Sequence, residues 1–370
     1  MTPPRPVVLL LGPSRGAISG VSTHVNALLA SALGREFELE HFQVGSEGRT
    51  EERCGRLGRL AAGPFALAAA ILRRQAAIVH VNTSLNARAF WRDLAYVLVA
   101  KLCGARVLYQ VHGGALREFS AGWKFVLRAL VTLPNLAVVL SRVEHAAWRE
   151  IVPGQDVAVV PNGIDCAPYR MNSRPRREPE APLELVYIGR LAPRKGLAEA
   201  IAAVALARDA GVAARLVIAG AGPEEQLLRQ QVQSLGLESA VSFSGPAYGA
   251  GKAKLLGEAD ALLLASHAEG LPYALLEAMA AGVVPVVTPV GGIPDVVQPG
   301  LHGLMVPVGD AQAIAAAIGA LSRDRERLAL MSAACRERIA QAYSIDRAAQ
   351  DFGALYHKLE SRSWAPSRAG

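Results

Sequence analysis

The feature that most constrains this chain is an alternation, repeated over most of its length, of short runs of valine, isoleucine and leucine with longer segments rich in alanine and leucine. Buried strands of about four to eight residues and amphipathic helices of about ten or more give this pattern. Strands that alternate with helices form parallel sheets covered by helices, so the pattern argues against a β-sandwich and a helical bundle. The predicted strands are 7–11, 37–42, 78–81, 107–111, 136–140, 157–160, 185–188, 216–219, 241–243, 261–265, 286–288 and 304–306.

The series of strands and helices is interrupted at residues 166–182. This segment, CAPYRMNSRPRREPEAP, is rich in proline and charge and has no apolar periodicity, which is typical of a linker or an exposed connection. We therefore expect two doubly wound α/β domains, 1–166 and 167–345. Only helical patterns follow residue 310, and we expect a last helix, at about 346–370, to pack back on the first domain.

Composition excludes several classes of protein. Hydrophobic residues make up 51% of the chain and charged residues 19%, which is unlike a disordered segment. The longest apolar stretch of low charge, 60–72, is shorter than the roughly 20 residues of a membrane-spanning helix, and the apolar run near the N-terminus is too short for a signal peptide. The cysteines lack a C-x-x-C pair, which argues against a zinc site or a disulfide framework and favours a reducing cytoplasm. These cysteines are Cys54, Cys103, Cys166 and Cys335.

The basic excess is confined to one half of the chain. The net charge is +7; residues 1–170 hold 19 Lys and Arg against 12 Asp and Glu, whereas residues 171–370 hold 20 of each kind. A basic segment with interleaved aromatic side chains can lie on an anionic membrane, and the alternative is an ordinary solvated face. Nucleic acid is the less favoured partner, because no helix-turn-helix, zinc or single-strand-binding pattern is present. The clustered residues are Arg49, Arg53, Arg56, Arg59, Arg73, Arg74, Arg117, Trp123, Lys124, Phe125 and Arg128.

Two cations follow the first strand of the second half. The strand ends in Gly189, Arg190 and then APRKG, so Arg190 and Lys195 lie beyond the carboxyl end of a strand, where α/β sheets bind ligands. A helix predicted from about Leu197 adds backbone N–H groups and a favourable dipole. The combination suits a diphosphate, and the alternative is a solvated basic turn.

Two glycine-rich loops stand between a strand and a helix. They are GPSRGAISGVSTHV at 12–25 and AGAGP at 219–223, and each allows close approach of the backbone to a phosphate. Neither holds a full G-x-G-x-x-G, so a simple tight turn is as good an interpretation.

Two glutamates follow the strand at 261–265. Glu269 precedes a helix with Pro272 in its first turn, and Glu277 lies in the body of that helix. Eight residues place the two carboxylates roughly 10–12 Å apart, too far for the paired carboxylates of a glycosidase, so we expect them to act separately. Glu277 is surrounded by apolar residues and therefore needs a donor: sugar hydroxyls, or a structural bond from the backbone or an arginine.

The order and spacing of several motifs resemble the retaining glycosyltransferases of family 4, which have the GT-B fold and include many bacterial polysaccharide and glycolipid transferases. The motifs of the second half are VPNGID, IGRLAPRKG, VIAGAGP, FSG, EGLPYALLEAMAAG, GGIPDVV and GLMVP, and those of the first half are the glycine-rich loop, VHVN and QVHGG. One departure is GVVPVV, in which the proline, Pro285, stands one place later than is usual in the family. The resemblance implies two Rossmann-like domains that face each other across a cleft.

The resemblance also implies roles for individual residues. Arg190 and Lys195 would hold the donor diphosphate, and Glu277 would bind ribose hydroxyls. Glu269 would contact the donor sugar, and His112 would face the sugar and the acceptor. The remaining donor-binding positions are Gly16 and Gly20 at the diphosphate, Gly189, Gly222, and the backbone amides of Gly270, Leu271 and Pro272.

The implied reaction moves a hexosyl group from a UDP- or GDP-sugar to a hydroxyl of a carbohydrate or lipid-linked acceptor, with retention of configuration. The cations would stabilise the charge on the departing phosphate more in the transition state than in the ground state. Such cations can replace a metal, and no D-x-D stands at a strand end, so we expect no metal and no cofactor. The expected location is the cytoplasm, with peripheral contact to the inner face of the cell membrane left open.

Three other functions remain open. A GT-B sugar-nucleotide epimerase would act on the donor without an acceptor, although the E-G-L-P-x-x-L-L-E run disfavours it. A non-catalytic nucleotide-sugar-binding subunit of a polysaccharide-assembly complex would keep the ligand positions without transfer. A nicotinamide-dependent dehydrogenase is the most remote, because both the glycine fingerprint and the acidic ribose residue are missing.

Overall fold

The computed structural model describes residues 4–45, 53–84, 87–113, 131–170 and 181–361. Contacts divide the chain into two compact units. Unit 1 is Met1–Gly163 together with Ile345–Gly370, and unit 2 is Ile164–Ser344. The first unit therefore ends at Gly163, whereas the linker pattern predicts a boundary at residue 166. The C-terminal segment from Ile345 also belongs to unit 1.

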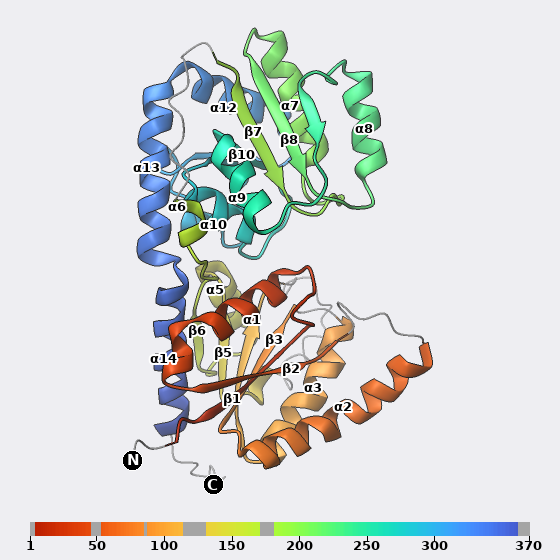
Figure 1. Cartoon of the computed structure of the whole chain (residues 1–370), viewed down its shortest axis with the longest axis vertical. Helices are drawn as coiled ribbons and strands as arrows, with labels where there is room; N and C mark the ends of the chain where they lie inside the picture. Colours follow the sequence, from red (N-terminus) through yellow and green to blue (C-terminus); the bar gives the residue numbers. More distant parts are fainter. Residues whose placement is uncertain (1–3, 46–52, 85–86, 114–130, 171–180, 362–370) are drawn as a thin grey trace. The chain divides into compact units, whose positions relative to one another are not determined.

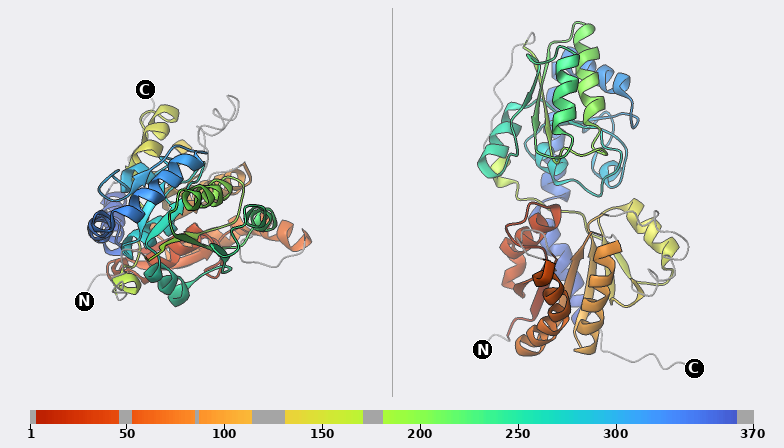
Figure 2. Two further views of the ribbon diagram at one scale, coloured as in Figure 1. Left: turned by 90° about the horizontal axis from the view of Figure 1, so that it is seen from above. Right: turned by 90° about the vertical axis from the view of Figure 1, so that its right-hand side faces the viewer.

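Unit 1 is built on a parallel sheet of six strands with helices on its two faces (Figure 1, Figure 2). Along β1 the side chains alternate: Val8 and Leu10 belong to one core cluster, and Leu9 and Leu11 to the other. The first cluster includes side chains of α1 and α14, and the second includes side chains of α2, α3 and α5. The strands are β1 (Val7–Gly12), β2 (Glu38–Gln43), β3 (Ile78–Thr83), β4 (Arg106–Val111), β5 (Leu136–Val139) and β6 (Val157–Val159); the helices are α1 (Gly20–Ala30), the 3-10 helix η1 (Ala32–Arg35), α2 (Arg53–Arg74), α3 (Ala87–Leu102), α5 (Arg142–Ile151) and α14 (Ile345–Ser361).

Unit 2 repeats this architecture with a second parallel sheet of six strands. Its strands read as continuous apolar runs because helices cover the two faces of a parallel sheet. The strands are β7 (Leu183–Ile188), β8 (Ala214–Ala219), β9 (Val241–Phe243), β10 (Ala261–Leu264), β11 (Val284–Val287) and β12 (Leu304–Met305); the helices are α6 (Ala167–Arg170), α7 (Leu197–Asp209), α8 (Glu225–Ser234), α9 (Gly249–Glu258), α10 (Tyr273–Ala280), α11 (Ile293–Val296), α12 (Ala311–Arg323) and α13 (Arg325–Ala342). The predicted α/β class is confirmed, and every predicted strand is present within two residues of its expected limits.

Each sheet contains one point at which the strand order reverses. The order is β2-β1-β3-β4-β5-β6 in unit 1 and β12-β11-β10-β7-β8-β9 in unit 2. The connection that follows β1 therefore runs towards one edge of its sheet and the one that follows β3 towards the other edge. The connections that follow β7 and β10 diverge in the same way. Open α/β sheets bind ligands at the carboxyl ends of the strands that flank such a reversal.

The C-terminal helix α14 is anchored in unit 1 by a buried polar bond as well as by apolar packing. The Tyr356 hydroxyl lies 2.7 Å from His80 Nδ1, and His80 Nε2 lies 2.9 Å from Gln110 Oε1. The ring of Phe352 packs against the rings of His80 and His24. Because Gln110 Oε1 is an acceptor, His80 carries its proton on Nε2, and Tyr356 donates to Nδ1.

In the described part of the chain, no helix combines the length and the hydropathy that a membrane span requires. The apolar stretch predicted at 60–72 lies in α2, which contains Pro64.

The histidines of unit 1 make its stability depend on pH. Burial lowers the pKa of His24 and of His80 to about 3. These rings stay neutral in the folded chain while unfolding lets them take up protons below their ordinary pKa of 6.5. The free energy of unfolding should therefore fall as the pH falls from 6.5 towards 3, by up to about 1.4 kcal/mol per pH unit for each ring.

Urea titrations at several pH values measure this dependence. Residues 164–344, which form unit 2, contain no tryptophan, and Trp148 is buried in unit 1, so tryptophan fluorescence reports on unit 1. The variant His24→Gln should lose about one ring's share of the slope below pH 6.5 and behave like the wild type above pH 7. Equal slopes in the two proteins would show that His24 takes up its proton in the folded state.

Candidate functional site

The reversal point of the unit 2 sheet is spanned by an ion pair. Lys195 lies in the loop after β7, and Glu269 lies in the loop after β10. Lys195 Nζ is 2.7 Å from Glu269 Oε1, with the two side chains 28% and 9% exposed. The Ser266 hydroxyl donates to the same oxygen at 2.7 Å. Because both donors use Oε1, Glu269 Oε2 has no hydrogen-bond partner among the described residues and can accept one from a ligand.

The loop that carries Glu269 is held by its neighbours. The Thr288 hydroxyl donates to the Ser266 carbonyl at 2.5 Å, and the Gly292 N–H donates to the Gly270 carbonyl at 2.7 Å. Gly291 has φ +57°, and a Cβ there would lie 2.0 Å from the Glu269 carbonyl oxygen. The two glycines of the GGIPD motif thus hold the backbone conformation of the E-G-L-P motif.

Pro272 is placed differently from the prediction. It is the N-cap of α10, with extended backbone, rather than a residue of the first helical turn. A proline has no N–H, so the expected amide contact from Pro272 to a donor sugar is wrong. Gly270 and Leu271 precede it in the loop and keep their N–H groups.

Arg190 lies in the same loop after β7 as Lys195. Its side chain is exposed and makes no hydrogen bond or ion pair with any residue that the structure describes, while its carbonyl accepts a bond of 2.9 Å from the Tyr187 hydroxyl. Helix α7 begins two residues after Lys195, with Gly196 at its N-cap in the left-handed region, φ 67°. A Cβ at Gly196 would lie 1.9 Å from the Ala265 carbonyl oxygen, so glycine lets the helix start against the end of β10.

Glu277 has a donor that the sequence did not reveal. The carboxylate is buried, with 8% of its side chain exposed, and Lys252 Nζ lies 2.6 Å from Glu277 Oε1. Burial, together with the charge of Glu277 and a hydrogen bond to it, raises the pKa of the Tyr169 hydroxyl. The partner is thus a lysine of α9, and the expected backbone or arginine partner is not found among the described residues. Glu269 and Glu277 each hold a separate lysine.

The second glycine-rich loop serves packing within unit 2. A Cβ at Gly220 would lie 1.9 Å from the Gly189 carbonyl oxygen, and one at Gly222 would lie 2.1 Å from the Leu191 carbonyl oxygen. The loops after β7 and β8 therefore touch through their backbones, and the space beside Gly222 is occupied by this chain itself. The tight-turn interpretation accounts for Gly220 and Gly222 without a ligand.

The first glycine-rich loop is tied to helix α1. Gly20 is the first residue of α1, after the N-cap Ser19. The Ser22 hydroxyl donates to the Ser14 carbonyl at 2.9 Å, and Asn26 Nδ2 donates to the Arg15 carbonyl at 2.8 Å. At Gly16 the nearest atom to a Cβ would be 4.0 Å away, so the loop is open there among the described residues.

His112 follows β4 and is held from two sides. Its backbone N–H donates to the Thr83 carbonyl at 2.8 Å, and its Nε2 lies 2.8 Å from Asn82 Oδ1. The ring centroid is 4.6 Å from that of His24. Burial, together with His24 and His80, lowers the pKa of His112 well below its ordinary value, so the ring is neutral at pH 7.

Several predicted residues are outside what the structure describes. Arg49, Arg117, Trp123, Lys124, Phe125 and Arg128 lie in undescribed segments, and the side chains of Arg53 and Arg56 are not described. No cluster of three metal-ligating side chains is present in the described ranges.

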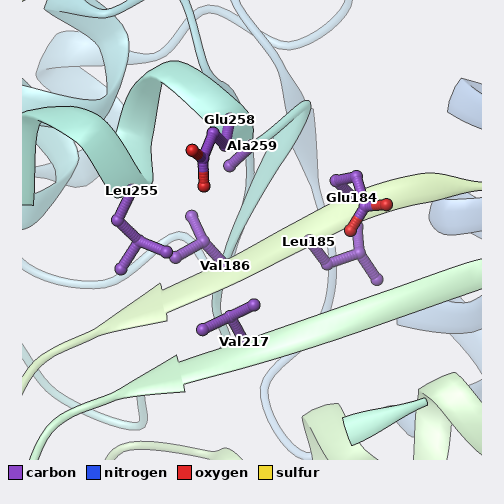
Figure 3. A pocket seen from close by; sticks show the side chains of 7 residues that line it. All are labelled: Glu184, Leu185, Val186, Val217, Leu255, Glu258 and Ala259. Carbon is purple, nitrogen blue, oxygen red and sulfur yellow. The ribbon is translucent and has the colours of Figure 1, made fainter. Parts of the chain in front are cut away.

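A pocket elsewhere in unit 2 offers a poor alternative for an anion. It is lined by residues of β7, β8 and the end of α9, and Figure 3 shows that two of its side chains, Glu184 and Glu258, are carboxylates. The lining is otherwise apolar and includes no predicted site residue. The loops after β7 and β10 remain the stronger candidate for a negatively charged ligand.

Comparisons with solved structures support the architecture. Sucrose-phosphate synthase from Thermosynechococcus elongatus has a TM-score of 0.80 at 19% identity, with 97% of this chain and 100% of that chain covered. HepE of Anabaena, solved with UDP and glucose, has a TM-score of 0.75 at 18% identity, with 96% and 100% covered. At these identities the similarity shows the fold, which is GT-B.

Comparisons of sequence give the family. A putative colanic acid biosynthesis glycosyltransferase, WcaL of Salmonella typhimurium, is 37% identical over 199 residues, which cover 52% of this chain and 48% of that protein. The chain spans about half the length of the curated relatives it matches. The profile "Glycosyltransferase Family 4" matches residues 18–168, and the profile "Glycosyl transferases group 1" matches residues 170–338. Since the two profiles follow one another along most of the chain, this protein belongs to the family 4 glycosyltransferases.

Proposed function

We propose that this chain transfers a hexosyl group from a nucleoside diphosphate sugar to an acceptor hydroxyl, with retention of configuration, in the synthesis of a bacterial surface polysaccharide or glycolipid. The observation that carries the proposal is the Lys195–Glu269 pair at the reversal point of the unit 2 sheet. It sets a cation for the phosphate next to a carboxylate for the sugar. Family membership, the name of the WcaL relative and the UDP and glucose held by HepE support this function.

The leaving group explains the cations. Departure of a nucleoside diphosphate builds negative charge on its distal phosphate, and groups that meet this charge accelerate the reaction. Arg190 and Lys195 supply positive charge, and the first N–H groups of α7 add hydrogen-bond donors. The bond of Lys195 to Glu269 holds the ammonium group in place before the substrate arrives.

The carboxylates explain sugar recognition. Glu269 Oε2 accepts a hydrogen bond from a hydroxyl of the donor sugar, while Oε1 is occupied by Lys195 and Ser266. Glu277, with its charge balanced by Lys252, accepts hydrogen bonds from ribose hydroxyls. In the retaining step the leaving phosphate takes the proton of the acceptor hydroxyl on the same face of the sugar. Arg190 and Lys195 then stabilise the charge on the departing phosphate in place of a metal ion, and no cofactor is required.

The proposed location is the cytoplasm, with α2 of unit 1 in contact with an anionic membrane surface. Phe65 and Leu72 of α2 are 79% and 65% exposed, and a spacing of seven residues puts them on one side of the helix. Arg59 and Arg73 belong to the same helix. Apolar side chains among cations on a helix surface suit binding to anionic lipid headgroups.

Removal of Lys195 tests the phosphate site. Lys195→Ala should lower kcat for donor turnover by about 10²-fold or more, because it removes charge stabilisation from the transition state. The measurement is release of nucleoside diphosphate from a panel of UDP- and GDP-sugars. Lys254→Ala, which removes an exposed lysine of α9, is the matched control and should keep wild-type turnover. Undiminished turnover in Lys195→Ala would exclude the proposed site.

The acceptor dependence of the same assay separates the alternatives. Product that forms without an acceptor would favour the epimerase, and stabilisation by nucleotide sugars without transfer would favour the non-catalytic subunit.

The buried Lys252–Glu277 pair gives a second prediction. Lys252→Met alone leaves a carboxylate buried without its cation, which should cost about 3–5 kcal/mol of unfolding free energy. The double variant Lys252→Met/Glu277→Gln should regain much of that stability but not the affinity for the donor. Thermal unfolding with and without nucleotide sugar measures the two effects. Donor affinity equal to that of the wild type in the double variant would remove Glu277 from the ribose site.

The membrane contact is tested by sedimentation with vesicles that contain anionic lipid. Phe65→Ser/Leu72→Ser should bind such vesicles several-fold more weakly than the wild type, because less apolar area enters the headgroup region. Leu227→Ser, on an exposed leucine of α8 in unit 2, is the control. A wild-type protein that stays in the supernatant would rule out the contact.

A further inference from the structure

The side chain of Asn82 connects the two strands, β3 and β1, between which the strand order of the unit 1 sheet reverses. It lies near the carboxyl end of β3, is 2% exposed, and its Nδ2 donates to the carbonyl of Leu11 on the neighbouring strand β1 at 3.1 Å. A backbone carbonyl only accepts hydrogen bonds, so this contact decides which end of the Asn82 amide is the NH₂ group. The Asn82 oxygen must then face the other way.

That oxygen faces His112. Asn82 Oδ1 lies 2.8 Å from His112 Nε2. Because an amide oxygen cannot donate, His112 must carry a proton on Nε2. Burial and the neighbouring rings His24 and His80 keep His112 neutral, so there is no second proton for Nδ1. The Leu11 carbonyl thus determines, through Asn82, the tautomer of His112.

The opposite nitrogen of the ring is left as an acceptor. His112 Nδ1 has no hydrogen-bond partner among the described residues. A turn of the ring that exchanges its nitrogens is opposed by the Nε2 bond to Asn82 Oδ1 and by the ring of His24, which packs edge-on with its centroid 4.6 Å away. A buried acceptor without a donor is unfavourable, which is a reason for it to receive a hydroxyl of a bound substrate.

We propose that Asn82 is a positioning residue for glycosyl transfer: it holds His112 as the Nε2–H tautomer, so that Nδ1 accepts a hydrogen bond from a substrate hydroxyl. The inference rests on the proposed function and on the role that the family resemblance implies for His112, which is to face the sugar and the acceptor. No covalent step or proton transfer to the ring is involved. The other role that Asn82 could have, as a tie between β1 and β3, affects stability alone.

The tautomer is measured directly by long-range ¹H–¹⁵N spectra of the full chain labelled with ¹⁵N-histidine. His112→Gln assigns the signal of His112. The wild type should show a protonated Nε2 and a bare Nδ1, and Asn82→Leu should show a ring that gains Nδ1–H character. A wild-type ring protonated on Nδ1, or a tautomer unchanged in Asn82→Leu, would overturn the proposal, whether or not the chain transfers a sugar.

Kinetics test whether the tautomer matters to transfer. Asn82→Leu should lower kcat by about tenfold, the loss expected when one hydrogen bond to the substrate is removed in the transition state, with little change in KM for the donor. Asn135→Leu is the control, because Asn135 also ties two strands, with its Oδ1 accepting from the Val107 N–H at 2.9 Å. It should lower stability without changing the tautomer or kcat. A shifted tautomer in Asn82→Leu with wild-type kcat would overturn the positioning role, and a wild type without transfer activity would count against the proposed function instead.

Discussion

The reversal of strand order in each sheet is the constraint on which the rest of this structure depends. In unit 1 it falls between β1 and β3, and in unit 2 between β7 and β10. At such a point, loops that would otherwise be covered by a crossover helix are separated and leave room for a ligand. The predicted chemistry of the chain gathers at these points: the first glycine-rich loop in unit 1, and Arg190, Lys195 and Glu269 in unit 2.

Each reversal point is crossed by a polar side-chain contact. In unit 2 it is the charged contact of Lys195 with Glu269, and in unit 1 it is the neutral contact of Asn82 with the Leu11 carbonyl. The two contacts have different consequences. The ion pair holds an ammonium group in the same loop as the exposed Arg190 side chain, which suits a diphosphate, whereas the amide fixes the proton position on a neutral imidazole. The basic excess of residues 1–170 is not needed for either, and it remains for the membrane contact proposed for α2.

Much of the fold could be predicted because strands buried in a parallel sheet are continuous apolar runs in the sequence, and glycine or polar residues mark where they end. The position of Arg190, Lys195 and Glu269 after β7 and β10 could be predicted too, because each follows directly on an apolar run, although a solvated basic turn gives the same pattern as a ligand site. Lys252 could not be predicted: it meets Glu277 through the packing of α9 on other elements, and nothing in GAGKAKLL marks it among exposed lysines. The packing role of Gly222 depends likewise on where the Leu191 backbone passes, which no local pattern reveals.

The account depends most on one claim, that the loops after β7 and β10 hold the diphosphate of the donor. A crystal structure of the chain with a bound nucleoside diphosphate tests it most directly. The account predicts a distal phosphate in contact with Arg190 and Lys195, and ribose hydroxyls bonded to Glu277. A diphosphate bound elsewhere, with the Arg190 and Lys195 side chains free of it, would contradict the account.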